Sequence, residues 1–187
     1  MSTDMIIAAM HKMDREHFVP DYLVHEAGFD VPLPIGYGQT ISQPTTVQRM
    51  LYWLEVEPGD DVLDVGSGSG WTTALLSYIT GSQGRVIAVE IVPELVEMGR
   101  KNCSTLGLRN VKFHKAGKEY GWPAQAPYDR ILVSAAAEQL PTEILNQLKP
   151  GGKLVIPVQH DILEITKISE NEFDTTAHQG FVFVPLV

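Results

Sequence analysis

The sequence predicts an α/β protein with one doubly wound sheet of seven strands, mostly parallel, whose last strands are antiparallel. Short apolar runs alternate with segments of helical periodicity through the middle of the chain, and this alternation is typical of parallel strands joined by right-handed crossovers. A glycine-rich turn follows the first central run, and the last two runs follow one another without a helix between them. We therefore expect a ligand site at the carboxyl ends of the parallel strands.

The expected strands are short and rich in β-branched residues, which suits a buried sheet. The last two are expected to pair as a hairpin, with the acidic segment 169–174 as the turn between them. The seven predicted strands are 62–65, 86–89, 111–115, 128–134, 153–158, 162–168 and 181–187.

The expected helices are bounded by local signals. Thr45 or Thr46 is placed near an N-cap, Pro93 stands at a helix start, and Gly107 is a helix stop. A mixed turn and short helix is expected over 18–27. The predicted helices are 3–13, 45–54, 71–80, 94–106 and one within 135–148.

Gly66, Gly68 and Gly70 form a G-x-G-x-G turn directly after the strand 62–65. Glycines let the backbone turn sharply and let a ligand approach it closely, and the helix that follows offers unpaired N–H groups and a positive dipole end. Roughly twenty residues later Glu90 ends the next strand, where a carboxylate accepts hydrogen bonds from a ribose diol. An ordinary strand-to-helix turn explains the glycines alone, but it does not explain the spaced acid.

Two features favour S-adenosylmethionine over a dinucleotide as the ligand. The dinucleotide pattern is G-x-G-x-x-G, whereas here the glycines alternate and Trp71 occupies the place of the last one. Asp64, just before the glycines, would face a cationic amino group and would repel the pyrophosphate of a nicotinamide cofactor. We therefore expect a methyl donor at this turn.

Composition predicts one domain over residues 1–187. The net charge of −9, without a basic run, argues against nonspecific nucleic-acid binding. No uncharged apolar stretch approaches the roughly 20 residues of a membrane span, and the start of the chain lacks a signal peptide's apolar core. The single Cys103 fits a reducing compartment, and the histidines lack the spacing of metal ligands. We expect a cytoplasmic monomer without a metal that binds neither nucleic acid nor a membrane.

Residues 30–44 have a composition of their own, with three prolines and two glycines. Such a stretch cannot form a regular helix or a central strand. It is either a loop between elements or a shaped wall of a site.

Several stretches carry the pattern of one family, in register through most of the chain. The GSGSG turn is shared by many methyltransferases, whereas the GQTIS segment is diagnostic. On these residues the chain resembles the protein-L-isoaspartate O-methyltransferase family, whose members methylate the α-carboxylate of L-isoaspartyl residues in damaged proteins. The matching stretches are MDREHFVP (13–20), PLPIGYGQTISQP (32–44), VLDVGSGSGW (62–71), Glu90 followed by PEL (93–95), APYDRILVSAAA (126–137), QLKPGGKLVIPV (147–158) and FVPLV (183–187).

The resemblance implies a Rossmann-like Class I methyltransferase that uses S-adenosyl-L-methionine and takes isoaspartyl proteins or peptides as substrates. It places Ser42 beside the methyl-accepting carboxylate, with residues 1–44 as a cap on the substrate side. It places Asp64 near the amino-acid end of the cofactor or the substrate backbone, so Ser42 and Asp64 are the candidate catalytic residues. Composition alone favours Ser42 as a turn hydroxyl that satisfies a backbone amide, and only the family pattern reverses this interpretation.

The other roles implied by the resemblance divide between the two substrates. Glu90 binds the ribose hydroxyls, and the glycine turn holds the methionine portion of the cofactor. The implied cofactor-binding residues are Gly66, Ser67, Gly68, Gly70, Glu90 and Gly117, and the implied substrate-binding residues are Thr40, Ile41 and Gln43.

Two departures from the family pattern bear on function. The family loop after the third strand reads G-D-G, and its acid accepts a hydrogen bond from the adenine amino group; here residues 116–118 read Ala-Gly-Lys. Either Glu119 or a backbone carbonyl takes that role. The segment 159–161 is also shorter than the family loop that helps to bind substrate. Two alternatives therefore stay open: a carboxyl methyltransferase of a dedicated peptide or small carboxylic acid, and a degenerate, non-enzymatic module that binds a nucleoside or a partner.

Overall fold

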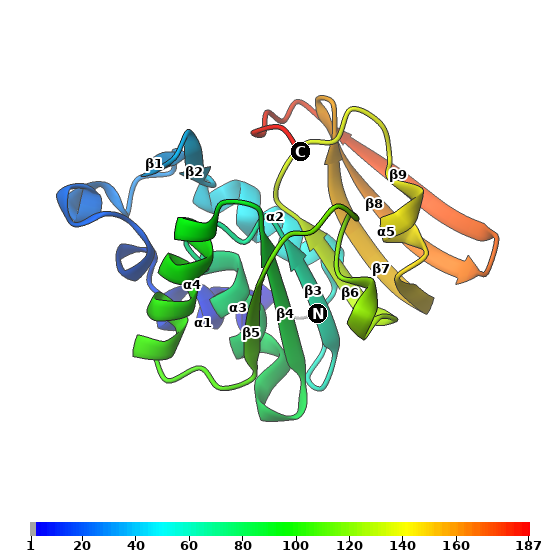
Figure 1. Ribbon diagram of the computed structural model, residues 1–187, viewed down its shortest axis with the longest axis horizontal. Helices are drawn as coiled ribbons and strands as arrows, with labels where there is room; N and C mark the ends of the chain where they lie inside the picture. The colour runs from blue at the N-terminus through cyan, green and yellow to red at the C-terminus, as the bar shows by residue number, and fades with distance from the viewer. Residues whose placement is uncertain (1–2) are drawn as a thin grey trace.

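The computed structural model describes residues 3–187, in which strands and helices alternate along the middle of the chain (Figure 1). The helices are α1 (Thr3–Lys12), α2 (Pro44–Leu54), α3 (Trp71–Thr80), α4 (Pro93–Thr105) and α5 (Thr142–Leu145), with 3₁₀ turns η1 (Arg15–Phe18), η2 (Asp21–Glu26), η3 (Gly81–Gln83) and η4 (Pro123–Gln125). The strands are β1 (Leu33–Gly36), β2 (Gln39–Ile41), β3 (Asp61–Val65), β4 (Arg85–Glu90), β5 (Val111–Lys115), β6 (Tyr128–Val133), β7 (Leu148–Val158), β8 (Asp161–Ser169) and β9 (Glu172–Gln179).

A seven-stranded sheet in the order β5-β4-β3-β6-β7-β8-β9 forms the centre of the molecule. Adjacent strands are parallel from β5 across to β7, whereas β8 is antiparallel to both of its neighbours, β7 and β9. The strand order reverses direction at β3, which lies between β4 and β6. The predicted doubly wound sheet with antiparallel closing strands is confirmed, and the point of reversal is where such sheets bind ligands.

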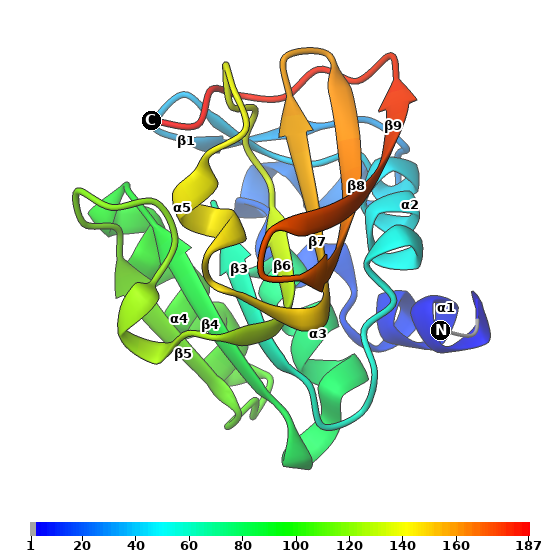
Figure 2. The same cartoon turned by 90° about the vertical axis from the view of Figure 1, so that its right-hand side faces the viewer.

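The two faces of the sheet are covered differently. Val62 on one face packs with the apolar side chains of α1 to α4, whereas Leu63 on the other face packs with Ile144 and Leu145 of α5. Figure 2 shows α5 and its loops over this second face. Because both faces are buried, β3 and β4 carry almost unbroken apolar runs, as expected for central parallel strands.

The last predicted strand is wrong. The structure places β9 at Glu172–Gln179, so the strand begins inside the predicted turn 169–174 and continues over 175–179, while residues 180–184 belong to no strand. β9 is an exposed edge strand, so it needs few apolar residues to pair with β8. Pro185 interrupts the apolar run that follows, and proline cannot donate a hydrogen bond to a strand ladder.

Three other elements differ from their predictions in length or in where they begin. The helix predicted within 135–148 is the single turn α5, and β7 begins at Leu148 instead of residue 153. α2 begins at Pro44 with Gln43 as its N-cap residue, instead of Thr45 or Thr46. Proline at the first helical position has its φ angle already set for the helix and lacks only an N–H that would be unpaired there.

Residues 33–41 form a small antiparallel hairpin of β1 and β2, which Figure 1 shows apart from the main sheet. The segment 30–44 thus contains no helix before Pro44 and no strand of the main sheet, as predicted. The Asp30 carboxylate joins it to α2, because it accepts hydrogen bonds from the Thr45 N–H at 2.8 Å and the Thr45 hydroxyl at 2.7 Å. The hairpin is therefore fixed to the start of a helix.

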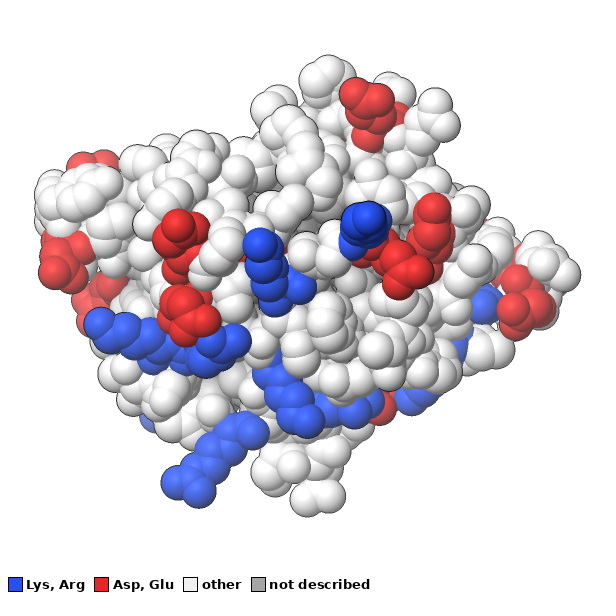
Figure 3. Space-filling model, in the orientation of Figure 1, with Lys and Arg blue, Asp and Glu red and all other residues white. Residues whose placement is uncertain are grey.

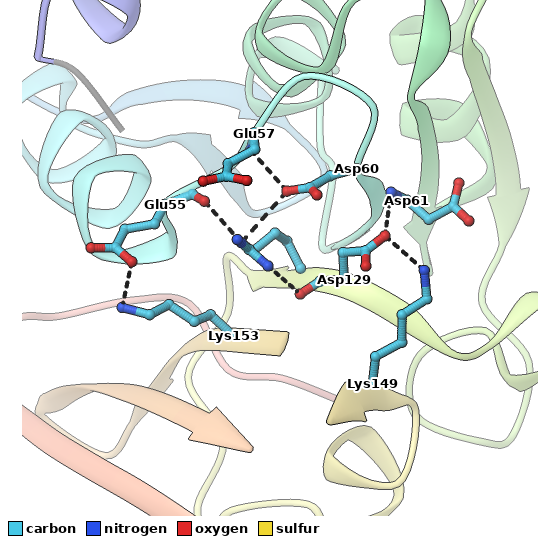
Figure 4. A network of polar contacts seen from close by, with 8 residues as sticks. Glu55, Glu57, Asp60, Asp61, Asp129, Lys149 and Lys153 are labelled. Atoms are coloured by element: carbon cyan, nitrogen blue, oxygen red, sulfur yellow. Dashed lines mark hydrogen bonds and ion pairs between the residues drawn. The ribbon is translucent and has the colours of Figure 1, made fainter. Parts of the chain in front are cut away.

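A polar network ties the amino ends of the strands together (Figure 4). Asp129 of β6 accepts a hydrogen bond from the Asp61 N–H at 2.9 Å and pairs with Lys149 of β7 at 2.8 Å. Arg130 donates to the Glu55 carbonyl at 2.9 Å. These contacts lie at the amino ends of the strands, opposite the carboxyl ends where a ligand site is expected.

Charged side chains of both signs are distributed over the face drawn in Figure 3, and the upper part of that face is mostly uncharged. Within residues 3–187 no helix is long and apolar enough to cross a membrane. No group of His, Cys, Asp and Glu in this range has the arrangement of a metal site.

Candidate active site

A cavity of about 250 Å³ lies where the carboxyl ends of β3, β4, β5 and β6 meet. The predicted convergence of the glycine turn, Glu90 and the loops after β5 and β6 at one place is confirmed by its lining. The lining also includes the hairpin and the end of the chain. Its main segments are 39–42, 65–69, 89–91, 116–121, 134–135 and 184–187.

The glycine turn forms one wall of this cavity. Gly66 and Gly68 adopt φ angles of +76° and +53°, a backbone region that residues with a Cβ enter at an energetic cost. The Gly66 N–H donates to the Val89 carbonyl at 2.8 Å, and this bond holds the turn against the tip of β4. α3 begins at Trp71, so its first N–H groups lie next to the turn.

Glu90 joins the two strand ends that border the cavity. Its side chain accepts hydrogen bonds from the Gly68 N–H at 2.9 Å and the Val92 N–H at 3.0 Å. Glu90 is 6% exposed and lines the cavity. Each carboxylate oxygen has a second lone pair, so the group can also accept from a pair of ligand hydroxyls.

Asp64 lies behind the cavity wall, and it is not a lining residue. Its Oδ2 accepts hydrogen bonds from the Thr72 and Thr73 hydroxyls at 2.9 and 2.7 Å, and its Oδ1 has no partner within residues 3–187. Burial raises the pKa of Asp64 to about 6. In this position the carboxylate braces the start of α3 against β3.

Gly70 also lies outside the cavity lining. A Cβ at this position would come within 3.0 Å of the Gly99 Cα and 3.2 Å of the Gly99 carbonyl oxygen of α4. Gly70 therefore lets the turn pack directly on a neighbouring helix, and its φ angle of +92° adds a second reason for glycine.

Ser42 stands between two cavities. It lines the first one and also a second cavity of about 450 Å³, whose walls include Pro32 and residues 180–184. Its hydroxyl forms no hydrogen bond with any residue in the range 3–187. The alternative interpretation of Ser42, a turn hydroxyl that satisfies a backbone amide, therefore does not describe the structure.

The other residues of the predicted acceptor wall divide between the cavities. Thr40 lines both cavities, and the buried Ile41 lines the first. Gln43 lines only the second, where its amide nitrogen donates to Asp30 at 3.1 Å and its carbonyl oxygen accepts from Thr46. The Gln43 side chain thus supports the start of α2.

The loop after β5 covers the end of the first cavity that lies near Gly117. Gly117, Lys118 and Glu119 line it, and nothing lies within 4 Å of where a Gly117 Cβ would be. The buried Gln147 holds the loop, because its side chain donates to the Tyr120 carbonyl at 2.8 Å and accepts from the Trp122 N–H at 2.8 Å. The position lacking the expected acid is therefore open space with a fixed frame around it.

The end of the chain is the part of the site that sequence reasoning missed. Residues 184–187 line the first cavity, and Val184 lines both. The segment is held by two backbone bonds of 2.8 Å, from the Ala136 N–H to the Val184 carbonyl and from the Leu186 N–H to the Ala136 carbonyl. Pro185 was the available signal, because proline disfavours a paired strand.

The cavity fits S-adenosylmethionine by the polar groups it presents. The Ser67 hydroxyl is buried in the wall and has no hydrogen-bond partner within residues 3–187, and buried polar groups without partners are rare unless a ligand or water completes them. Glu90 offers acceptors for a diol nearby. The glycines of the flanking turn carry no side chains, so a ligand can contact the backbone there.

The strand order, the glycine turn after the central strand and the acid at the tip of the next strand define a class I methyltransferase. The family model of protein-L-isoaspartate(D-aspartate) O-methyltransferase (PCMT) matches residues 1–187. A protein-L-isoaspartate O-methyltransferase from Methanopyrus kandleri is 43% identical over 190 residues, which cover 99% of this chain and 84% of that one. The chain belongs to the protein-L-isoaspartate(D-aspartate) O-methyltransferase family.

Solved structures agree with this assignment. One protein-L-isoaspartate O-methyltransferase superposes with a TM-score of 0.87 at 27% identity, covering 98% of this chain and 61% of that chain. A beta-aspartate methyltransferase (PCMT) structure from Plasmodium falciparum in complex with S-adenosyl-L-homocysteine gives a TM-score of 0.82 at 27% identity, covering 98% and 90%. That protein binds the demethylated form of the methyl donor.

Proposed function

We propose that this protein transfers a methyl group from S-adenosyl-L-methionine to the α-carboxylate of L-isoaspartyl residues in damaged proteins or peptides. The observation that carries the proposal is the free hydroxyl of Ser42 at the junction of the two cavities. The first cavity has the polar groups for the methyl donor. The second cavity extends from Ser42 to Pro32 and residues 180–184. Family membership supports the same reaction.

The cofactor supplies an electrophilic methyl group on a positively charged sulfur. Glu90 accepts hydrogen bonds from the ribose hydroxyls, and the Gly66–Gly68 turn with Ser67 holds the amino-acid end. Asp64 acts one layer behind them, because its bonds to Thr72 and Thr73 set the position of α3. We therefore assign Asp64 a positioning role in the donor site.

The acceptor needs orientation more than activation, because a carboxylate is already a nucleophile at neutral pH. Ser42 donates its hydrogen bond to one carboxylate oxygen, which turns the other oxygen toward the methyl group. Thr40 and Ile41 complete this wall, and Gln43 keeps it attached to α2. Holding the two reactants in line and excluding water supplies most of the rate.

Residues up to 44 form the cap on the substrate side in this proposal, and Gly117 borders the adenine. The acidic net charge of −9 suits a cytoplasmic monomer that acts on proteins without binding nucleic acid or a membrane. The cap, the adenine contact, the monomeric state and the cytoplasmic location are thus parts of the same proposal.

The test is a matched pair of synthetic peptides, one with an L-isoaspartyl residue and one with L-aspartate at the same position. With methyl-labelled S-adenosylmethionine, we expect a base-labile methyl ester on the isoaspartyl peptide and none above background on its twin. Equal labelling of both peptides, or no labelling of either, would contradict the proposal.

A second acceptor class is favoured by one feature. β7 and β8 are joined by a turn of only Gln159 and His160, with Val158 paired to Asp161, so no loop extends from this hairpin over the second cavity. A dedicated peptide or small carboxylic acid is the alternative acceptor. A panel of carboxylic acids and aspartyl peptides in the same assay identifies it by a higher kcat/KM than that of the isoaspartyl peptide.

A further inference from the structure

A buried arginine outside both cavities collects an unusual set of contacts. Arg15, in η1, is 4% exposed and forms no ion pair with a carboxylate in the described range 3–187. Its terminal nitrogens instead donate only to backbone carbonyls. The acceptors are the carbonyl oxygens of Ala27 at 3.1 Å, Phe29 at 3.2 Å, Val31 at 2.7 Å, Ile41 at 3.3 Å and Ser42 at 3.1 Å.

These carbonyls come from the two chain segments on either side of the β1–β2 hairpin. Residues 27–31 precede the hairpin, and Ile41 and Ser42 end it. The guanidinium therefore links the two segments at the base of the hairpin, because it donates hydrogen bonds to both of them. Without it, carbonyl groups of both arms would lose a hydrogen-bond donor, although the Phe29 carbonyl would keep the Val31 N–H at 2.9 Å, and unsatisfied carbonyls away from water are costly.

The same guanidinium lies against the donor side of the site. Its central carbon is 5.5 Å from the ring centroid of Trp71, the residue that follows the glycine turn and begins α3. The Trp71 ring nitrogen donates to the Met13 carbonyl at 2.9 Å, two residues before Arg15. One short segment thus touches both the acceptor wall and the donor turn.

Burial lowers the pKa of Arg15 to about 10, so the side chain stays charged at neutral pH. A charged donor forms stronger hydrogen bonds than a neutral one. The planar guanidinium also presents its donors in a fixed geometry that a lysine ammonium does not reproduce.

We propose that Arg15 is a positioning residue for methyl transfer, which holds the Ser42 end of the hairpin at a fixed distance from the glycine turn. This inference rests on the proposed function, because Ser42 is taken as the residue that orients the acceptor. Arg15 itself touches neither substrate. It acts through the backbone of Ile41 and Ser42.

The test compares Arg15→Lys, which keeps the charge but loses the planar fork, with Arg15→Gln, which removes the charge but keeps amide donors. We expect kcat/KM for the isoaspartyl peptide to fall on the order of 100-fold, as when a reactant is displaced by about 1 Å. The affinity for S-adenosylhomocysteine, measured by calorimetry, should stay within threefold, a change of less than about 0.7 kcal/mol. Arg49→Lys is the matched control, because Arg49 is exposed and its side chain forms no hydrogen bond or ion pair with residues 3–187.

Hydrogen exchange gives a readout that does not depend on the reaction. In both variants the amides of residues 32–43 should exchange faster, while those of 61–80 keep their protection. Unchanged kinetics with unchanged exchange would overturn the inference, and so would an equal loss of donor affinity and activity, which indicates general loss of structure. If the unmodified protein methylates no isoaspartyl peptide, the proposed function fails, and the exchange pattern with the donor affinity still shows whether Arg15 holds the hairpin in place.

Discussion

The backbone of Ser42 is held by a hydrogen bond, whereas its side chain is left available for a ligand. Its carbonyl is held by Arg15 at 3.1 Å, while its hydroxyl has no partner in residues 3–187 and faces the junction of two cavities. A hydroxyl fixed in this way can donate to an incoming carboxylate without first breaking another hydrogen bond. Preorganisation of this kind lowers the cost of orienting the acceptor.

Replacement of Ser42 with alanine should slow methyl transfer and leave donor binding intact. A hydrogen bond to a charged group contributes roughly 1.5–3 kcal/mol, so kcat/KM for the isoaspartyl peptide should fall about 10- to 100-fold. Ser82→Ala is the control, since Ser82 is exposed in η3 at the opposite end of α3. A Ser42→Ala enzyme with unchanged turnover would show that another group orients the acceptor.

Glu90→Ala should have the reverse effect. The substitution removes the proposed acceptor of two ribose hydroxyls and also releases the Gly68 and Val92 N–H groups. We expect Kd for S-adenosylhomocysteine to rise on the order of 100-fold, measured by calorimetry. The exposed Glu94 in the first turn of α4 supplies the control Glu94→Ala. Donor affinity that stays the same in Glu90→Ala would exclude the ribose contact.

At the scale of elements, the contact between β3 and α3 depends on a buried carboxylate. Asp64 is fully buried, and it accepts hydrogen bonds from the two threonines that begin the helix. Burial disfavours the charged form and raises its pKa to about 6, above the value of about 3.9 expected in the unfolded chain. The ionised group therefore costs stability at neutral pH.

Asp64→Asn should change how stability depends on pH. The folded protein binds the Asp64 proton more tightly than the unfolded chain, so this residue lowers the free energy of unfolding as the pH rises from about 4 to 6. Above pH 6 the cost is complete, roughly 3 kcal/mol for a shift of this size. Urea unfolding of Asp64→Asn and of the unmodified protein should show that the free energy of unfolding of the variant rises relative to that of the unmodified protein over that pH range. Asp21→Asn, at an exposed position, should show no such trend, and parallel curves for Asp64→Asn would refute the assignment.

The elements that sequence could predict are those whose burial leaves a pattern in their own residues. β3, β4 and their crossovers follow from apolar runs, because a strand covered on both faces must be apolar. β9 escaped prediction because an edge strand needs only one partner and can be polar along its length. The segment 181–187 was predicted to be a strand because it is apolar. Its partly buried side chains, Phe181, Phe183 and Leu186, pack against the core, and its backbone bonds to Ala136 in the loop after β6, contacts that the local pattern does not reveal.

At the scale of the whole molecule, sequence could predict where the proposed donor half of the site lies, and where the proposed acceptor half lies only in part. Gly66 and Glu90 follow strand ends, and the topology of a doubly wound sheet brings such ends together. Arg15 could not be assigned from its neighbours, because its five acceptors lie 12 to 27 residues away along the chain. The resemblance placed it inside the matching stretch 13–20 but gave it no role.

The two cavities are also built from different parts of the chain. The donor cavity is built mainly from turns at the ends of buried strands, whose positions are fixed by the core, whereas the acceptor cavity is built from segments 32–46 and 180–184 with Ser134. Those segments lie outside the main sheet, so their exposed positions, such as Pro32 and Val182, can change without altering the strand order, while Leu33, Ile35 and Ile41 stay in the apolar core. Evolution or laboratory selection could therefore exchange the acceptor of such an enzyme by grafting two peripheral segments, while the machinery that delivers the methyl group stays as it is.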